Sequence, residues 1–243
     1  THLSKTSKFS TLKRRLASIS VIHKLNGHYL DTKHPLITEN LLGIKRVKGT
    51  YQKSKKPILI NDLKTIINVI DKEKNEKKGI RNKALLLIGF AGGFRRSELV
   101  EILFEDIEFV NEGVKIFVKR SKTDQSGEGM IKGIPYFANP NYCPVHSLKN
   151  WINENKDQTG KIFNISDKNV ALIIKKYAEK AGLDQNKYSG HSLRSGFATS
   201  TAEQGAEERS IMAMTGHKTT QMVRRYIREA NLFKNNALNK IKI

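Results

Sequence analysis

The sequence has little cysteine, proline or tryptophan: one Cys, five Pro and one Trp in 243 residues. The single thiol, Cys143, excludes an internal disulfide and cannot form a zinc site by itself. Chains of this kind are typical of reducing compartments, so we expect a cytoplasmic protein that uses neither a structural metal nor a bound cofactor.

Long apolar runs are also missing. The run at residues 84–91 is far shorter than the roughly 18 residues that a membrane-spanning helix needs. We therefore predict a buried helix there and expect no membrane partner. The chain opens with Thr1 instead of Met and shows no signal peptide, which we interpret as the start of a truncated or processed product.

Acidic residues are scarce, at 23 Asp and Glu against 44 Lys and Arg, which gives a net charge of +21. Such an excess of cations favours a polyanionic partner, and nucleic acid is the leading candidate. An apolar content of 38% is sufficient for a real core. At this length we expect one large domain and one small one.

Residues 1–47 form the small domain in this interpretation, with two helices separated by a break at Asn26-Gly27. The first helix carries apolar residues near one face and basic residues off it, and the second spans 37–47. Two helices bury little surface, so this domain packs on something else or lacks its beginning. The apolar positions are Leu12, Leu16, Ile19, Ile22 and Leu25, then Leu41, Leu42 and Ile44 inside; the basic ones are Lys13, Arg14 and Arg15.

A basic linker follows at residues 48–56. We predict that it runs beside phosphates, and that Lys13, Arg14 and Arg15 also contact DNA. The alternative is a solvated connector with no partner. The linker's candidate contacts are Lys48, Lys53, Lys55 and Lys56.

Residues 57–243 make the large domain, which we predict to be mainly α-helical with a small antiparallel β-sheet. A helix capped by Asn61 or Asp62 should bury Leu63, Ile66, Ile67 and Ile70. The helix at 81–91 stops at Gly92-Gly93, and the next begins at 97, so Arg95 lies in the turn between them. Strands are expected at 114–119 and 131–136. Helices starting at Pro144 and after Ser166 should place Trp151 and Tyr177 in the core.

The stretch from His191 to Tyr226 holds two imidazoles, a guanidinium and a phenol. Displacement at a phosphodiester builds negative charge on the phosphoryl oxygens, which fixed arginines stabilise. Arg95 and Arg194 fit that role, and Tyr226 is a candidate nucleophile that needs a base or a positive field because its ordinary pKa is near 10. Lys122 and His191 are both candidates for proton transfer, although Lys122 is also compatible with guarding a strand edge.

The spacing of these residues supports one site. His191 and Arg194 project to one side of a helix, and His217 follows a helix that should end at Gly216, so it emerges from a turn instead of lying in a core. Tyr226 stands among arginines, a poor setting for a buried structural tyrosine.

These residues resemble the tyrosine recombinases, also called phage-type integrases. GFRRSEL at 93–99 is similar to the family's first arginine box, HSLR at 191–194 to its His-x-x-Arg box, and Gly216-His217 with Tyr226 to its last histidine and nucleophile. Lys122 is similar in placement to the β-hairpin lysine. The resemblance covers about 57–226, and residues 1–47 look like the later helices of the core-binding domain.

The resemblance implies a recombinase or integrase of mobile DNA that cuts and rejoins strands without metal or ATP. Tyr226 would form a 3′-phosphotyrosyl link, while Arg95, Arg194 and His217 stabilise the phosphoryl oxygens. Lys122 would protonate the leaving oxygen, and His191 would assist at the tyrosine. Glu98 orients a catalytic side chain or is an ordinary charge at a helix start.

The implied partner is double-stranded DNA with a specific target site, bound by a homotetramer. The apolar tail after Tyr226 would dock on a neighbouring protomer or close over its own domain. In a prokaryote the protein would associate with the nucleoid. The tail residues are Ala230, Phe233, Ala237, Leu238 and Ile241.

Three rival functions remain open. A type IB topoisomerase shares the covalent tyrosine chemistry but relaxes supercoils as a monomer, and a noncatalytic DNA-binding protein would use the same fold. A metal-dependent nuclease would rest on four acidic residues that look like a helix end and its exposed flank, without a clear ligand pattern. Those residues are Glu101, Glu105, Asp106 and Glu108.

Overall fold

The computed structural model describes residues 2–50, 54–121, 127–155, 159–230 and 237–241. The chain divides into two compact units, Thr1–Ser54 and Lys55–Ile243. Among the described residues, no helix is both long and apolar enough to cross a membrane.

The first unit is a pair of helices, α1 (Phe9–Leu25) and α2 (Pro35–Lys48), preceded by a 3-10 turn at His2–Ser4. The helix expected at 37–47 begins two residues earlier, because Pro35 takes its first position and the His34 side chain accepts a hydrogen bond from the Leu36 N–H. No described residue of this unit is buried. The prediction that Leu42 lies inside was therefore wrong: it is 43% exposed, since two helices alone enclose no core.

The second unit is built around α4 (Glu76–Ala91), whose residues 84–91 are all buried as predicted. The helix begins five residues before the predicted start because the Asn75 side chain caps it by accepting from the Lys78 N–H. The neighbours α6 (Pro144–Asn153) and α8 (Ser192–Glu203) pack against it. Gly92 ends the helix, in agreement with the sequence.

Helix α3 (Ile60–Ile70) buries the four predicted apolar residues. Its cap is Leu59, so the prediction of a cap at Asn61 or Asp62 was wrong. Asp62 lies in the first turn, where its carboxylate binds the Lys56 ammonium and the Tyr188 hydroxyl, both at 2.9 Å.

The sheet has three antiparallel strands in the order β1 (Ile107–Val110), β2 (Gly113–Val118) and β3 (Met130–Pro135). Both predicted strands are present, one residue earlier than expected at each end. Strand β1 was missed because it is four residues long and follows an acidic stretch. Within this stretch, Glu101 is the C-cap of α5 (Arg96–Val100), and Glu101, Glu105 and Glu108 are exposed, in agreement with the predicted helix end and exposed flank. Asp106 departs from the prediction, because it is buried.

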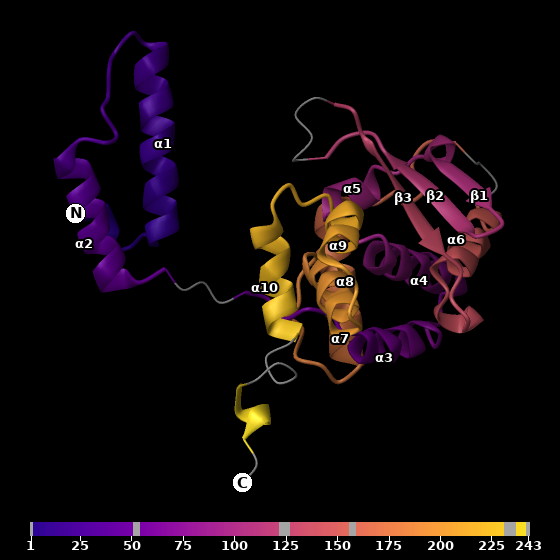
Figure 1. Ribbon diagram of the computed structural model, residues 1–243. Helices are drawn as coiled ribbons and strands as arrows, with labels where there is room; N and C mark the ends of the chain where they lie inside the picture. Colours follow the sequence, from indigo (N-terminus) through magenta and orange to yellow (C-terminus); the bar gives the residue numbers. More distant parts are fainter. Residues whose placement is uncertain (1, 51–53, 122–126, 156–158, 231–236, 242–243) are drawn as a thin grey trace. The chain divides into compact units, whose positions relative to one another are not determined.

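The remaining helices complete the C-terminal side of the unit. Ser166 caps α7 (Asp167–Lys180) as predicted, and Trp151 and Tyr177 are core residues, also as predicted. Figure 1 shows α8, α9 (Glu208–Thr215) and α10 (Thr220–Ala230) standing together in orange and yellow, and the three are in mutual contact. Further 3-10 turns lie at Phe104–Asp106, Pro140–Tyr142, Gln185–Lys187 and Ala237–Lys240.

Candidate active site

The turn between α4 and α5 delivers Arg95. Gly93 adopts a left-handed φ of 55°, which lets the chain reverse directly after α4. A Cβ at this position would stand 3.0 Å from the Phe197 ring and 3.2 Å from the Thr215 methyl. The turn therefore packs tightly against α8 and α9, and Arg95 becomes the N-cap residue of α5.

Glu98 and Ser121 hold the Arg95 side chain. The Arg95 Nη1 donates to Glu98 Oε1 at 2.5 Å and to Ser121 Oγ at 2.6 Å, and the Arg95 backbone N–H donates to Glu98 Oε2 at 3.0 Å. Ser121 Oγ also donates to Glu98 Oε1 at 2.9 Å. Burial alone raises the pKa of Glu98, but the hydrogen bonds and charge of Arg95 and the Ser121 hydroxyl leave that pKa lowered. Glu98 is thus an ionised carboxylate that fixes Arg95.

Helix α8 provides Arg194, which is 1% exposed. Its Nη1 donates to the Gly93 carbonyl at 2.8 Å, which ties α8 to the turn that carries Arg95. Its Nη2 lies 3.1 Å from His217 Nε2. Burial, and then the charge of Arg95, lower the pKa of Arg194 to about 10, so the guanidinium remains charged at neutral pH.

The hydrogen bonds of His217 define its tautomer. A guanidinium only donates, so Nε2 accepts from Arg194, and the ring proton is on Nδ1, which donates to Thr215 Oγ1 at 2.7 Å. Thr215 Oγ1 in turn donates to the Ile211 carbonyl at 2.6 Å. Burial, followed by the charges of Arg194 and Arg95, lowers the pKa of His217 to about 4. His217 is therefore neutral in this arrangement.

The turn that carries His217 starts at Gly216, the left-handed C-cap of α9, as the sequence indicated. The further expectation that His217 lies outside a core was wrong, because its side chain is buried. The reason is the polar chain from Arg194 to Thr215, which satisfies both ring nitrogens inside the domain.

His191 and Tyr226 meet across α8 and α10. His191 is the N-cap residue of α8, and its Nε2 lies 3.3 Å from the Tyr226 hydroxyl. Burial, and then the neighbouring arginines, lower the pKa of His191, which favours the neutral ring that accepts a proton. The Tyr226 ring is half-buried against a small apolar cluster and lies 6.1 Å from the His217 ring.

The structure thus gathers five of the six candidate catalytic residues from three separate segments of the chain. Electrostatic coupling joins Arg95 to Arg194, His191 and His217. The sixth, Lys122, lies outside the described residues, and its role remains a prediction.

Comparisons with known proteins bear on this cluster. The sequence pattern of the phage integrase family matches residues 58–232, which include all six positions. The chain belongs to this family. An integrase/recombinase xerD homolog of Selenomonas ruminantium is 42% identical over 98% of this chain and 74% of the relative. A tyrosine recombinase XerA of Pyrococcus furiosus is 29% identical over 71% of this chain, which spans 57% of that relative.

Solved structures agree on the tyrosine recombinase fold. A XerA recombinase superposes with a TM-score of 0.60 at 17% identity, covering 98% of this chain and 86% of the other. The Tn1549 transposon integrase in complex with transposon right end DNA gives 0.64 at 16% identity, covering 95% and 80%. The fold and the family membership expected from the motifs are confirmed.

Several residues around this recombinase site escaped the sequence analysis. Ser121 and Thr215 carry the hydrogen bonds that orient Arg95 and His217, and Lys132 is buried beside them. Lys132 had a usable signal, because alternation along β3 puts it on the same face as Ile134. Ser121 and Thr215 had none beyond their position next to Lys122 and Gly216.

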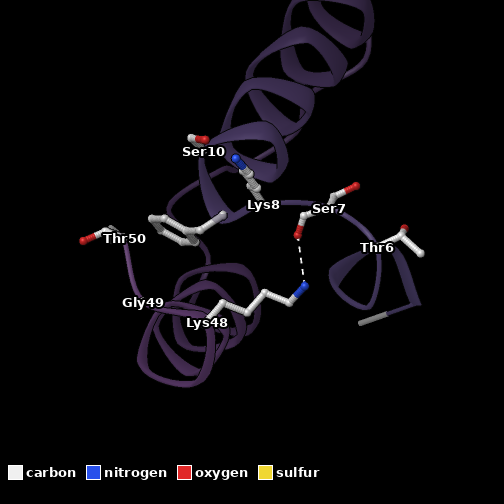
Figure 2. Close-up of a pocket in the computed structure, with 8 residues that line it drawn as sticks. Thr6, Ser7, Lys8, Ser10, Lys48, Gly49 and Thr50 are labelled. Carbon is white, nitrogen blue, oxygen red and sulfur yellow. Dashed lines mark hydrogen bonds between the residues drawn. The ribbon is translucent and has the colours of Figure 1, made fainter. Parts of the chain in front are cut away.

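The candidate DNA contacts fall into two groups. Lys13, Arg14 and Arg15 are exposed on α1. Lys48, Lys55 and Lys56 bind protein groups. The Lys48 ammonium donates to the Ser7 carbonyl (Figure 2) and also to the Lys5 carbonyl. Lys55 donates to the Asn186 carbonyl at 2.5 Å. The hydrogen bond to Asp62 raises the pKa of Lys56. Lys53 lies outside the described residues.

The four acids of the metal-nuclease alternative each face a lysine. Glu105 and Asp106 lie 2.5 and 3.0 Å from Lys119, Glu101 lies 2.7 Å from Lys161, and Glu108 lies 3.3 Å from Lys115. Within the described ranges, no group of three or more metal-ligating side chains comes together.

Proposed function

We propose that this chain is a site-specific DNA recombinase that cleaves and rejoins strands through a covalent 3′-phosphotyrosine. The observation that carries the proposal is the Tyr226 hydroxyl, 3.3 Å from a His191 ring whose pKa is lowered, beside the buried Arg194–His217 pair. In this proposal Tyr226 is the nucleophile, His191 the proton acceptor and Arg194 the fixed cation.

The proposed cleavage step balances as follows. The Tyr226 oxygen forms a bond to phosphorus, its proton passes to His191 Nε2, and the bond from phosphorus to the 5′ oxygen breaks. The leaving oxygen takes a proton from Lys122 and departs as a 5′ hydroxyl. The phosphotyrosyl ester keeps the bond energy, so a second strand's 5′ hydroxyl reverses the step without ATP.

Arg95 and Arg194 hold the two nonbridging oxygens in this mechanism. Arg95 is aimed by Glu98 and Ser121, whereas the hydrogen-bond partners of Arg194, a carbonyl and a neutral imidazole, are both uncharged. A phosphate that binds Arg194 compensates a buried charge, which makes electrostatic stabilisation strong there.

A suicide DNA substrate tests the proposal. A nick near the scissile phosphate lets the short 5′ product diffuse away, so the wild-type chain should accumulate a covalent adduct on a denaturing gel. Tyr226→Phe should bind the same DNA and form none. Tyr136→Phe is a matched control, because Tyr136 lies outside the site. An equal adduct from the Tyr226→Phe variant would refute the proposal.

Two further measurements distinguish this proposal from the rival functions. Adduct formation in excess EDTA argues against metal-dependent cleavage. A topoisomerase IB relaxes plasmids that lack a target site, whereas a recombinase exchanges strands only between target sites. Binding without any adduct would identify a noncatalytic DNA-binding protein.

We propose that residues 1–47 with the linker 48–56 form the DNA-contacting arm, and that 57–243 form the catalytic domain. The exposed side chains of Lys13, Arg14 and Arg15 support this division. Replacing all three by Gln should remove roughly three phosphate contacts. The logarithm of the DNA association constant should then fall less steeply with the logarithm of the salt concentration. An unchanged slope would show that these three side chains do not contact DNA phosphates and would contradict this assignment of the DNA-contacting arm.

The target-bound form is proposed to be a tetramer joined by the C-terminal tail. Leu238 and Ile241 are 67% and 58% exposed. The second unit also has an apolar groove of about 670 Å³ that suits the tail of another copy. Residues lining the groove include Leu63, Leu87, Phe90, Phe137 and Phe197.

Deleting residues 231–243 tests this docking. The truncated chain should bind a single half-site normally but lose cooperative binding to paired half-sites in a gel-shift titration. Leu238→Ser should weaken cooperativity in the same direction, and Lys240→Ser is its matched control. Unchanged cooperativity after the deletion would contradict tail docking.

A further inference from the structure

Lys132 is a buried lysine that the proposed mechanism does not use. It is 0% exposed on β3, on the same face as buried Ile134, while Ile131 and Gly133 on the other face are exposed. A buried ammonium is costly unless hydrogen bonds compensate it, so its contacts indicate why it is there.

The Lys132 ammonium bridges two backbone carbonyls from different helices. Its Nζ donates to the Gly92 carbonyl at 2.8 Å and to the Met214 carbonyl, and it lies 4.9 Å from the centre of the Phe94 ring. Gly92 is the C-cap of α4, and Met214 lies in the last turn of α9. Carbonyls at helix C-termini have no intrahelical partner and carry the negative end of the dipole, so one cation satisfies both ends.

These two helix ends carry opposite halves of the active site. The chain runs from Gly92 through Gly93 and Phe94 to Arg95, and from Met214 through Thr215 to His217. A bridge between the two carbonyls therefore fixes the distance between the turn that aims Arg95 and the turn that aims His217. Arg194 spans the same gap, with one end on Gly93 and the other on His217.

We propose that Lys132 is a positioning residue for strand cleavage: a buried cation that holds the Arg95 turn and the His217 turn in register without touching the phosphate. The inference rests on the proposed function, because register matters only if both turns serve one scissile phosphate. A displacement of about 1 Å in such a site costs on the order of 10²-fold in rate.

The charged groups around Lys132 are consistent with an ammonium at neutral pH. Glu98 favours the charged form, while Arg194 and Arg95 oppose it, and His217 is coupled to it as a neutral ring. Burial is the largest influence and lowers the pKa of Lys132 to about 8. A DNA phosphate between the two arginines adds negative charge nearby and favours the ammonium further.

A role in positioning and a role in stability alone give different kinetics. In a single-turnover reaction with excess suicide substrate, the first-order rate constant belongs to the bound, folded chains, and the amplitude reports how many there are. A lysine that only stabilises the fold changes the amplitude. A positioning lysine changes the rate constant.

The experiment compares wild type with Lys132→Met, Lys132→Arg and the control Lys115→Met. Methionine keeps much of the volume without the charge, and arginine keeps a cation with several donors. Lys115 lies on the adjacent strand β2, exposed and paired with Glu108. We expect the Met variant to bind DNA normally and form adduct roughly 10²-fold more slowly, the Arg variant to recover part of that rate, and the Lys115 control to match wild type.

Other outcomes overturn the inference. A wild-type rate constant in Lys132→Met, with or without lost amplitude, makes Lys132 a stabilising residue only, and so does a Met variant that leaves no folded chain. If adduct forms as slowly in the Arg variant as in the Met variant, a cation at this position does not restore the rate constant. The positive charge of Lys132 is then not what positions the two turns. The reaction of the wild-type chain distinguishes the two proposals, because an absence of adduct in that reaction contradicts the proposed function itself.

Discussion

The two arginines of the site stand in opposite electrostatic surroundings. Arg95 has an 18% exposed side chain and is paired with the Glu98 carboxylate, which also accepts from Ser121. Arg194 is almost completely buried, and its hydrogen bonds go to the Gly93 carbonyl and to neutral His217. The charge of Arg95 is therefore compensated by a carboxylate before substrate arrives. The charge of Arg194 is stabilised mainly by the dipoles of a carbonyl and a neutral imidazole.

This difference indicates a division of labour. A salt-bridged guanidinium is well oriented but has part of its charge neutralised, whereas a buried guanidinium with uncharged partners retains a strong field. Arg95 thus contributes mainly geometry, and Arg194 contributes mainly charge. The phosphodiester supplies the negative charge that the Arg194 region lacks.

Replacing Arg194 should have the largest effect on chemistry. Arg194→Gln removes the buried charge, so we expect adduct formation to fall by about 10³-fold, as for loss of a principal oxyanion donor. The melting temperature should stay the same or rise, because an incompletely compensated buried cation disfavours the folded state. Single-turnover cleavage and thermal unfolding measure the two effects, with exposed Arg209→Gln as the control. A large fall in melting temperature would contradict the assignment of charge to Arg194.

Replacing Arg95 should lower stability, in contrast to replacing Arg194, which should lower activity without lowering stability. Arg95→Gln leaves the Glu98 carboxylate buried without its main cation, so the free energy of unfolding should fall by about 3 kcal/mol. The pKa of Glu98 should rise in the variant for the same reason. Chemical denaturation at several pH values measures both changes.

The double variant provides the control for this pair. Arg95→Gln with Glu98→Gln should recover most of the lost stability, because no buried charge is left unpaired, while cleavage stays slow. Equal destabilisation in the single and double variants would show that Glu98 does not depend on Arg95 for its stability.

The sequence predicted the residues of this comparison but not their surroundings. Arg95 in a turn, Arg194 on a helix and His217 after Gly216 follow from local signals: glycine pairs, apolar periodicity and a helix stop. The partners of Arg194 come from residues 101 positions earlier and 23 later, which no local pattern records. For the same reason, the burial of His217 was predicted wrongly.

Element ends show the same limit. The start of α4 depends on the Asn75 cap, and the start of α3 on the positions of Lys56 and Tyr188, which draw Asp62 away from a capping role. Leu42 is exposed instead of interior because the two helices of the first unit do not enclose a core by themselves. Periodicity predicts faces, and tertiary partners decide whether they are buried.

The charge of Arg194 should also appear in the pH dependence of stability. Burial and Arg194 lower the pKa of His217 from 6.5 to about 4. Between those values the unfolded chain binds a proton that the folded chain does not, so stability from this group rises with pH across that window and is constant above it. The contribution lost by pH 4 should be about 3 kcal/mol, slightly less than the limit set by the full shift in pKa. In Arg194→Gln this slope should flatten; an unchanged slope would assign it to other groups.

Removing the far end of the polar chain should give the smallest effect. Thr215→Val keeps the shape but deletes the hydroxyl that accepts the His217 Nδ1 proton, so a buried N–H loses its partner at a cost of about 1 kcal/mol. The neutral ring is then free to move its proton to Nε2, which breaks its acceptor bond from Arg194 and should slow cleavage about tenfold, the equivalent of 1.4 kcal/mol. Nitrogen-15 NMR of the imidazole reports the tautomer, and Thr219→Val is the exposed control. If Nδ1 stays protonated and cleavage is unaffected, Thr215 does not set the state of His217, and the field of Arg194 alone keeps the ring neutral.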